Sequence, residues 1–170
     1  MQSTLRSRSF YTVLVGLCSV LIASPVAAQR AFIQRPSIIA PSARTVQVKP
    51  TLAGFRINES TSAARRRLGA QVVTDSLGSG PDALVSLSNP TTGITVIAGP
   101  VDGVGIILVT RRDAGALDGI KVGDRRSAVI ARWGPPAAGS ESAGLWIAGK
   151  WVITVTFDGE GRVARLGIGQ

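Results

Sequence analysis

The stretch "GIKVGDRRSAVIARWG", residues 119–134, has a diverged copy upstream, "GFRINESTSAARRRLG", at residues 54–69. A shift of 65 positions aligns Gly54 with Gly119, Ile57 with Val122, Glu59 with Asp124, Ala63 with Ala128, Arg67 with Arg132 and Gly69 with Gly134. Each copy places helix-capping residues before a short helical run and a glycine after it: Asn58, Glu59 and Ser60 in the first copy, Asp124 in the second. The repeat predicts two short helices that end at Gly69 and Gly134.

Strand-like segments follow each predicted helix. "DALVSLS", "GITVIAG" and "VGIILVT" follow the first, and "LWIAG", "KWVITVTF" and a last strand follow the second. A helix of about nine residues is not stable alone, and a sheet with one apolar face needs a cover. The sequence therefore predicts an α+β fold of two tandem units, residues 52–115 and 116–170. Each unit is a short helix packed on a three- to four-stranded antiparallel sheet, and whether the units share one sheet stays open.

The beginning of the chain predicts export. Arg6 and Arg8 precede an apolar run at residues 10–23, and small residues follow up to Ala28. This pattern is typical of a signal peptide, residues 1–28, cleaved near Ala28, which predicts a periplasmic protein. A retained membrane anchor is the alternative, but the run is shorter than the roughly 20 apolar residues that span a bilayer. Cys18 follows Leu17 rather than a small residue, so the sequence predicts no lipidation.

Residues 29–51 form a basic segment with three prolines and no acidic residue. Its cations are Arg30, Arg35, Arg44 and Lys49. This composition predicts a flexible arm that is either a solvated tail or a tether to an anionic surface, such as lipid headgroups or lipopolysaccharide. The whole chain has 19 basic and 10 acidic residues, and it keeps an excess of 7 positive charges without Arg6 and Arg8. Nucleic acid is not an expected partner outside the cytoplasm.

The composition argues against an enzyme. The chain has no His, and its single Cys, Cys18, lies in the predicted signal peptide. We therefore expect no catalytic residues, no metal site and no cofactor. Asp158 and Glu160 in "FDGEG" are interpreted as part of a hairpin turn rather than a Ca²⁺ loop, which needs more acids or amides.

Three segments of the second half, "IKVGDRRSAVIARWGPP", "LWIAGKW" and "VTFDGEGRV", resemble the small outer-membrane assembly lipoproteins of the BamE (SmpA/OmlA) type. The tandem arrangement is similar to that of the β-lactamase inhibitor protein. The resemblance implies a periplasmic protein-binding module linked to outer-membrane or envelope assembly. The chain departs from the family pattern in lacking the lipoprotein Cys and in having Trp133 where Leu is usual before Gly134.

The expected function is therefore non-enzymatic binding of an envelope protein through the open face of the sheet. The candidate contact residues are Trp146, Thr154 and Thr156. Trp146 lies either on that face, as an interface hot spot, or inside the seam between the units, because the register of its short strand is not fixed. The alternative function is a proteinaceous inhibitor of a secreted or periplasmic hydrolase that uses the loops at residues 88–93 and 99–104.

Overall fold

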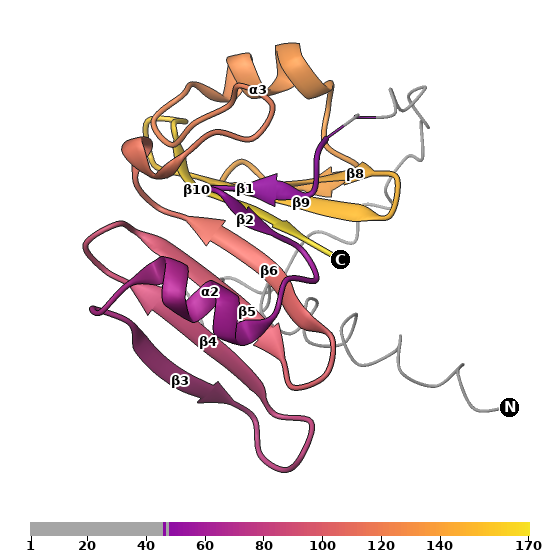
Figure 1. Cartoon of the computed structure of the whole chain (residues 1–170). Coiled ribbons are helices and arrows are strands. Elements are labelled where there is room, and N and C mark those ends of the chain that lie inside the picture. The colour runs from indigo at the N-terminus through magenta and orange to yellow at the C-terminus, as the bar shows by residue number, and fades with distance from the viewer. Residues whose placement is uncertain (1–45, 47) are drawn as a thin grey trace, which may run out of the picture. The chain divides into compact units, whose positions relative to one another are not determined.

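The computed structural model of the protein describes Val46 and residues 48–170, so the predicted signal peptide and Arg30, Arg35 and Arg44 lie outside the described residues. The strands are β1 (Thr51–Leu52), β2 (Phe55–Arg56), β3 (Val73–Leu77), β4 (Leu84–Asn89), β5 (Ile94–Gly99), β6 (Gly103–Val109), β7 (Ala138–Gly139), β8 (Ala143–Ala148), β9 (Trp151–Phe157) and β10 (Val163–Gly169). The helices are α2 (Thr61–Leu68), α3 (Arg126–Trp133) and the short 3-10 helix η1 (Arg112–Ala114) (Figure 1).

Both predicted helices are confirmed. Ser60 caps the start of α2, where its hydroxyl accepts a hydrogen bond from the Ala63 amide at 3.3 Å. The helices end at Gly69 and Gly134, whose φ angles of +85° and +80° favour glycine. The prediction that Asp124 caps α3 is wrong. Arg125 holds the cap position without a side-chain bond, and the Asp124 carboxylate instead accepts from the Lys121 amide at 2.8 Å.

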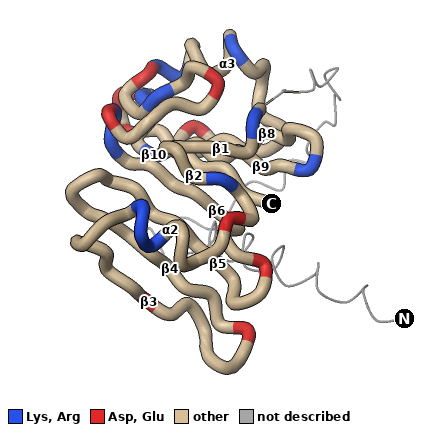
Figure 2. The backbone as a smooth tube through the Cα atoms, viewed as in Figure 1, with Lys and Arg blue, Asp and Glu red and all other residues tan. Residues whose placement is uncertain are grey.

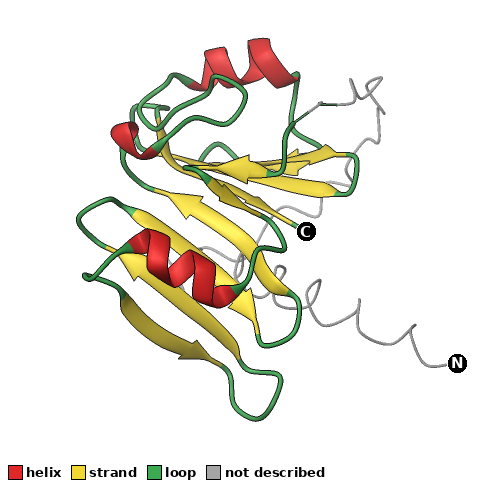
Figure 3. Ribbon diagram, viewed as in Figure 1, coloured by secondary structure: helices red, strands yellow, loops and turns green. Residues whose placement is uncertain are grey.

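The predicted α+β fold of two tandem helix-on-sheet units is wrong. The protein is mostly β, and strands β3 to β10 form one eight-stranded antiparallel sheet in the order β3-β4-β5-β6-β10-β9-β8-β7 (Figure 3). The junction is the β6–β10 pair, in register from Leu166 opposite Val109 to Gly169 opposite Ile106. Each of these strands would otherwise leave an unpaired edge, so their pairing satisfies both edges and merges the two halves into one sheet and one core. The separate β1–β2 hairpin was not predicted.

The repeated segments do form matching local structure. In the first copy Asn58 N–H donates to the Val104 carbonyl at 2.7 Å, and Val104 N–H donates to the Glu59 carbonyl at 2.8 Å. In the second copy Gly123 N–H donates to the Val163 carbonyl at 2.7 Å, and Val163 N–H donates to the backbone carbonyl of Asp124 at 2.8 Å. Each repeat therefore fastens the start of its helix to one of the two strands that meet at the sheet junction.

The core lies on the side of the sheet that carries the helices. Residues that pair across antiparallel strands point to the same face. One such row crosses six strands and is buried throughout: Leu87, Val96, Ile107, Ile168, Ile153 and Trp146. Ala64 and Leu68 of α2 and Val129 and Trp133 of α3 belong to the same core. Both helices and the β1–β2 hairpin therefore cover one face of the sheet, which we call the helix side (Figure 1).

Candidate functional site

Trp146 does not lie on the open face of the sheet. It pairs with Ile153, points to the helix side, and is 2% exposed. Its ring meets that of Trp133 edge-on, with 5.6 Å between the centroids, and its indole N–H donates to the Gly134 carbonyl at 2.9 Å. Trp146 is therefore a structural contact between β8 and the end of α3, and it is removed from the predicted binding residues.

Asn89 has the corresponding place beneath α2. This buried side chain on β4 donates its amide N–H to the carbonyl of Leu68, the last residue of α2, at 2.8 Å. Its side-chain oxygen accepts from the amides of Thr91 and Thr92. A strand side chain thus satisfies a free carbonyl at the end of each helix, as buried polar groups require.

Thr154 and Thr156 do lie on the face away from the helices, which we call the outer face. Two rows of paired residues define it across six strands. The first is Ser88, Thr95, Leu108, Gly167, Thr154 and Leu145, and the second is Ser86, Ile97, Ile106, Gly169, Val152 and Ile147. Neither row contains a charged residue. No helix of the described residues packs on these rows, so their apolar side chains lie outside the main core.

The accessible part of the outer face is over β8 and β9. Ile97 and Ile106 are buried, whereas Ile147 on β8 is 57% exposed and its neighbours Val152 and Thr154 are partly exposed. Gly167 shapes the centre of this region, because a Cβ there would collide with the Leu108 and Thr154 side chains that close over it. The result is a surface of aliphatic and hydroxyl side chains around Ile147, bordered by one cation, the partly exposed Arg165, which pairs with Thr156.

The loops proposed for hydrolase inhibition lie apart. Residues 90–93 connect β4 to β5, and residues 100–102 connect β5 to β6, so the six-residue strand β5 separates them. A strand of that length spans about 20 Å. The two loops therefore lie at opposite ends of the sheet and do not enter one active-site cleft together.

The best-connected carboxylate is Asp118, in the turn that precedes Lys121. It accepts two hydrogen bonds from the Arg132 guanidinium, at 2.9 and 2.6 Å, and one from the Trp133 indole at 3.0 Å. Hydrogen bonding to Arg132, and then to Trp133, lowers the pKa of Asp118 below its usual value, although partial burial opposes the shift. This arrangement fastens the turn to α3 and engages both oxygens of the Asp118 carboxylate.

Asp118→Asn is expected to lower the free energy of unfolding by about 1 kcal/mol at neutral pH, because solvent screens the exposed Arg132. The folded-state pKa of Asp118 is depressed, so its contribution is full above the unfolded pKa, about 4. The contribution disappears as pH falls through the folded pKa. Urea unfolding at neutral and acid pH should show the difference between wild type and variant shrinking in acid. Asp113→Asn is the control. It removes the Arg111–Asp113 ion pair, in which both side chains are more than half exposed, and it should have a smaller effect. An Asp118→Asn difference that is unchanged in acid would contradict this account.

The remaining candidate residues have structural explanations. Asp158 accepts hydrogen bonds from the amides of Glu160 and Arg162, as the predicted hairpin turn requires. Within the described part of the chain, no three His, Cys, Asp or Glu side chains gather to hold a metal ion. Lys49, the described member of the basic arm, is exposed beside β1. Among the described residues, no helix has the length and apolar character to cross a membrane.

Comparison with known proteins gives no match: no family model, no curated protein and no solved structure is significantly similar to the chain.

Proposed function

We propose that this protein is a non-enzymatic binding module that holds another protein against the outer face over β8 and β9. The observation that carries the proposal is the composition of that face: two six-residue rows without a charge, with Ile147 exposed at their end. Charge depletion around exposed aliphatic groups is typical of the centre of a protein interface. A lone exposed isoleucine needs no such explanation, but here it continues an apolar row across the sheet.

Several features support binding rather than catalysis. The sequence has no His, and Cys18 is its single Cys. The carboxylates of Glu59, Asp118 and Asp124 each bind an arginine and lie on the helix side, away from the proposed surface. An apolar and hydroxyl-lined sheet offers shape and area to a partner and no nucleophile with an adjacent base.

The location and the family of the partner rest on the sequence. We infer a periplasmic role from the signal-peptide pattern of residues 1–28, and an envelope partner from the resemblance of residues 119–168 to BamE-type proteins. Both stay predictions. The exposed part of the outer face adds a requirement on the partner, which must present an apolar patch of low charge where it covers Ile147.

Ile147→Glu is expected to weaken partner capture at least about tenfold, because a carboxylate would be desolvated in an apolar contact. A photo-crosslinking residue at Thr154 would first identify the partner in cells, and capture would then be compared between variants. Ile130→Glu is the matched control: Ile130 is 37% exposed on α3, on the other side of the sheet. Capture that survives Ile147→Glu, or that Ile130→Glu reduces equally, would contradict binding through this face.

A further inference from the structure

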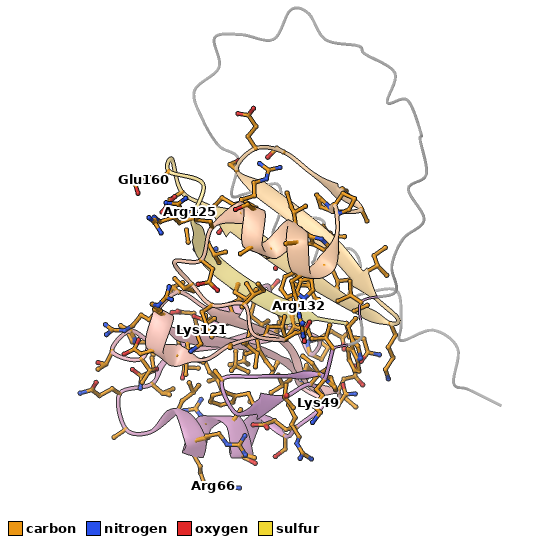
Figure 4. The ribbon with its side chains drawn as sticks, turned by 90° about the horizontal axis from the view of Figure 1, so that it is seen from above. Lys49, Arg66, Lys121, Arg125, Arg132 and Glu160 are labelled. Atoms are coloured by element: carbon orange, nitrogen blue, oxygen red, sulfur yellow. The ribbon has the colours of Figure 1, made fainter. Side chains whose placement is uncertain are left out.

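We propose that the helix side carries an electrostatic attachment surface for an anionic lipid bilayer, independent of the protein-binding face. The surface consists of five cations around α2 and the β1–β2 hairpin: Lys49, Arg56, Arg65, Arg66 and Arg67. We call it the α2 patch. All five residues are exposed, and Arg66 extends from α2 away from the sheet (Figure 4). Figure 2, in which Lys and Arg are blue, shows the blue segments of α2 and β2 on the side of the sheet that carries the helices.

The members of the α2 patch are held together by contacts between α2 and the hairpin. The Arg67 guanidinium donates to the Gly54 carbonyl in the hairpin turn and lies over the Phe55 ring, 5.3 Å from its centroid. Arg56 follows Phe55 directly, and Ile57 N–H donates to the Pro50 carbonyl at 3.1 Å, which brings the residue after Lys49 beside the end of β2. The patch is therefore one surface built from three segments.

Most cations of the α2 patch have no acidic partner. Arg67 is bound to Glu59 at 3.2 Å, and the Glu59 side chain is 11% exposed. Around α3, three arginines are paired with acids: Arg112 with Asp124, Arg132 with Asp118 and Arg162 with Glu160. Arg125 and Arg126, at the start of α3, form no salt bridge within the described residues. In the described residues, Lys49, Arg56, Arg65 and Arg66 form no salt bridge, so their charge remains available to a partner.

The chemistry of the patch favours lipid headgroups over an acidic protein. Stable protein interfaces usually have a well-packed centre from which water is excluded. The exposed large hydrophobic residues of the described chain are Val73, Val101, Ile130 and Ile147, and none belongs to the patch. Long cationic side chains without fixed partners suit mobile phosphates, and each such residue strengthens attraction to an anionic membrane. The segment that leads to Lys49 adds Arg30, Arg35 and Arg44 without an acid, which continues the charge along the chain.

The test measures co-sedimentation of the protein, as the cell produces it, with vesicles of phosphatidylcholine mixed with anionic phosphatidylserine. The triple variant Arg56→Gln/Arg65→Gln/Arg66→Gln is expected to lose about a hundredfold in affinity, because three cations leave the surface. Arg67 is kept because it fastens the hairpin to α2. Binding of the parent should also fall steeply as salt is raised and be weak on phosphatidylcholine alone.

The matched control removes three exposed or partly exposed cations outside the patch, in the variant Lys121→Gln/Arg125→Gln/Arg165→Gln. The two triple variants have the same net charge, so a loss of less than tenfold in the control would support a localised patch. Equal losses in both would overturn it, since binding would then depend on total charge alone. Parent binding that is equal on charged and uncharged vesicles would also overturn it. None of these readouts involves Ile147, so the protein-binding proposal stands or fails separately.

Discussion

Replacing Trp146 with alanine is expected to lower the free energy of unfolding by about 3–5 kcal/mol, the usual cost of truncating a buried tryptophan. The substitution removes the edge-on contact with Trp133 and the hydrogen bond to the Gly134 carbonyl. It also opens a cavity between β8 and the end of α3, in a core that draws on both halves of the chain. Urea denaturation followed by circular dichroism would measure the loss.

Two substitutions separate the parts of this effect. Trp146→Phe keeps an aromatic ring but leaves the Gly134 carbonyl without its donor, so we expect a smaller loss, about 1–3 kcal/mol. Ile147→Ala changes the adjacent, exposed residue and should have little effect on stability. A Trp146→Ala variant with wild-type stability would contradict the position of Trp146 in the core. Such a result would return this residue to the open face, where sequence alone allowed it.

The side on which Trp146 lies follows from a turn that the sequence does contain. Ala148 pairs with Trp151 across the two residues Gly149 and Lys150, and Gly149 has a φ of +64°. A two-residue hairpin fixes the register, which places Trp146 opposite Ile153. Ile153 belongs to the strongly apolar side of its strand. Recognising the two-residue turn therefore predicts that Trp146 shares this buried side.

Other parts of the fold have weaker sequence signals. The helices and strands β4, β5, β6, β8 and β9 were found because their apolar pattern and turn residues agree. The sequence does not predict strand β3, "VTDSL". This strand lies at the edge of the sheet with most of its side chains exposed, so it does not need alternating apolar residues. The sequence does not predict that β6 pairs with β10. Pairing between strands far apart in the chain depends on which strand edges remain unpaired, and the local periodicity of a segment does not show that.

The candidate site was predicted in part for the same reason. The alternation of Thr154 and Thr156 with Ile153 and Val155 placed both threonines on the outer face correctly. Their neighbours on that face come from other strands: Leu108 from β6, Gly167 from β10 and Ile147 from β8. Such a surface is assembled by register across the sheet, so no single segment of the sequence identifies it.

Gly103→Ala is the second substitution with a large expected effect, a loss of at least about 3 kcal/mol in the free energy of unfolding. Gly103 begins β6 with a φ of +70°, and an added Cβ would collide with the Glu59 carbonyl oxygen. Backbone cannot yield as a flexible side chain does. The same carbonyl accepts from Val104 N–H, so the collision would also disturb the attachment of α2 to the sheet.

Gly161→Ala is the matched control for Gly103→Ala. Gly161 has the same φ of +70°, but an added Cβ there would meet no atom within 4 Å. Its cost should be limited to backbone strain, about 1 kcal/mol. The difference between the two variants in urea denaturation therefore isolates the collision with Glu59. Equal losses would show that the attachment of α2 to β6 is loose enough to move aside, and would weaken the case that the α2 patch is held in place by the sheet.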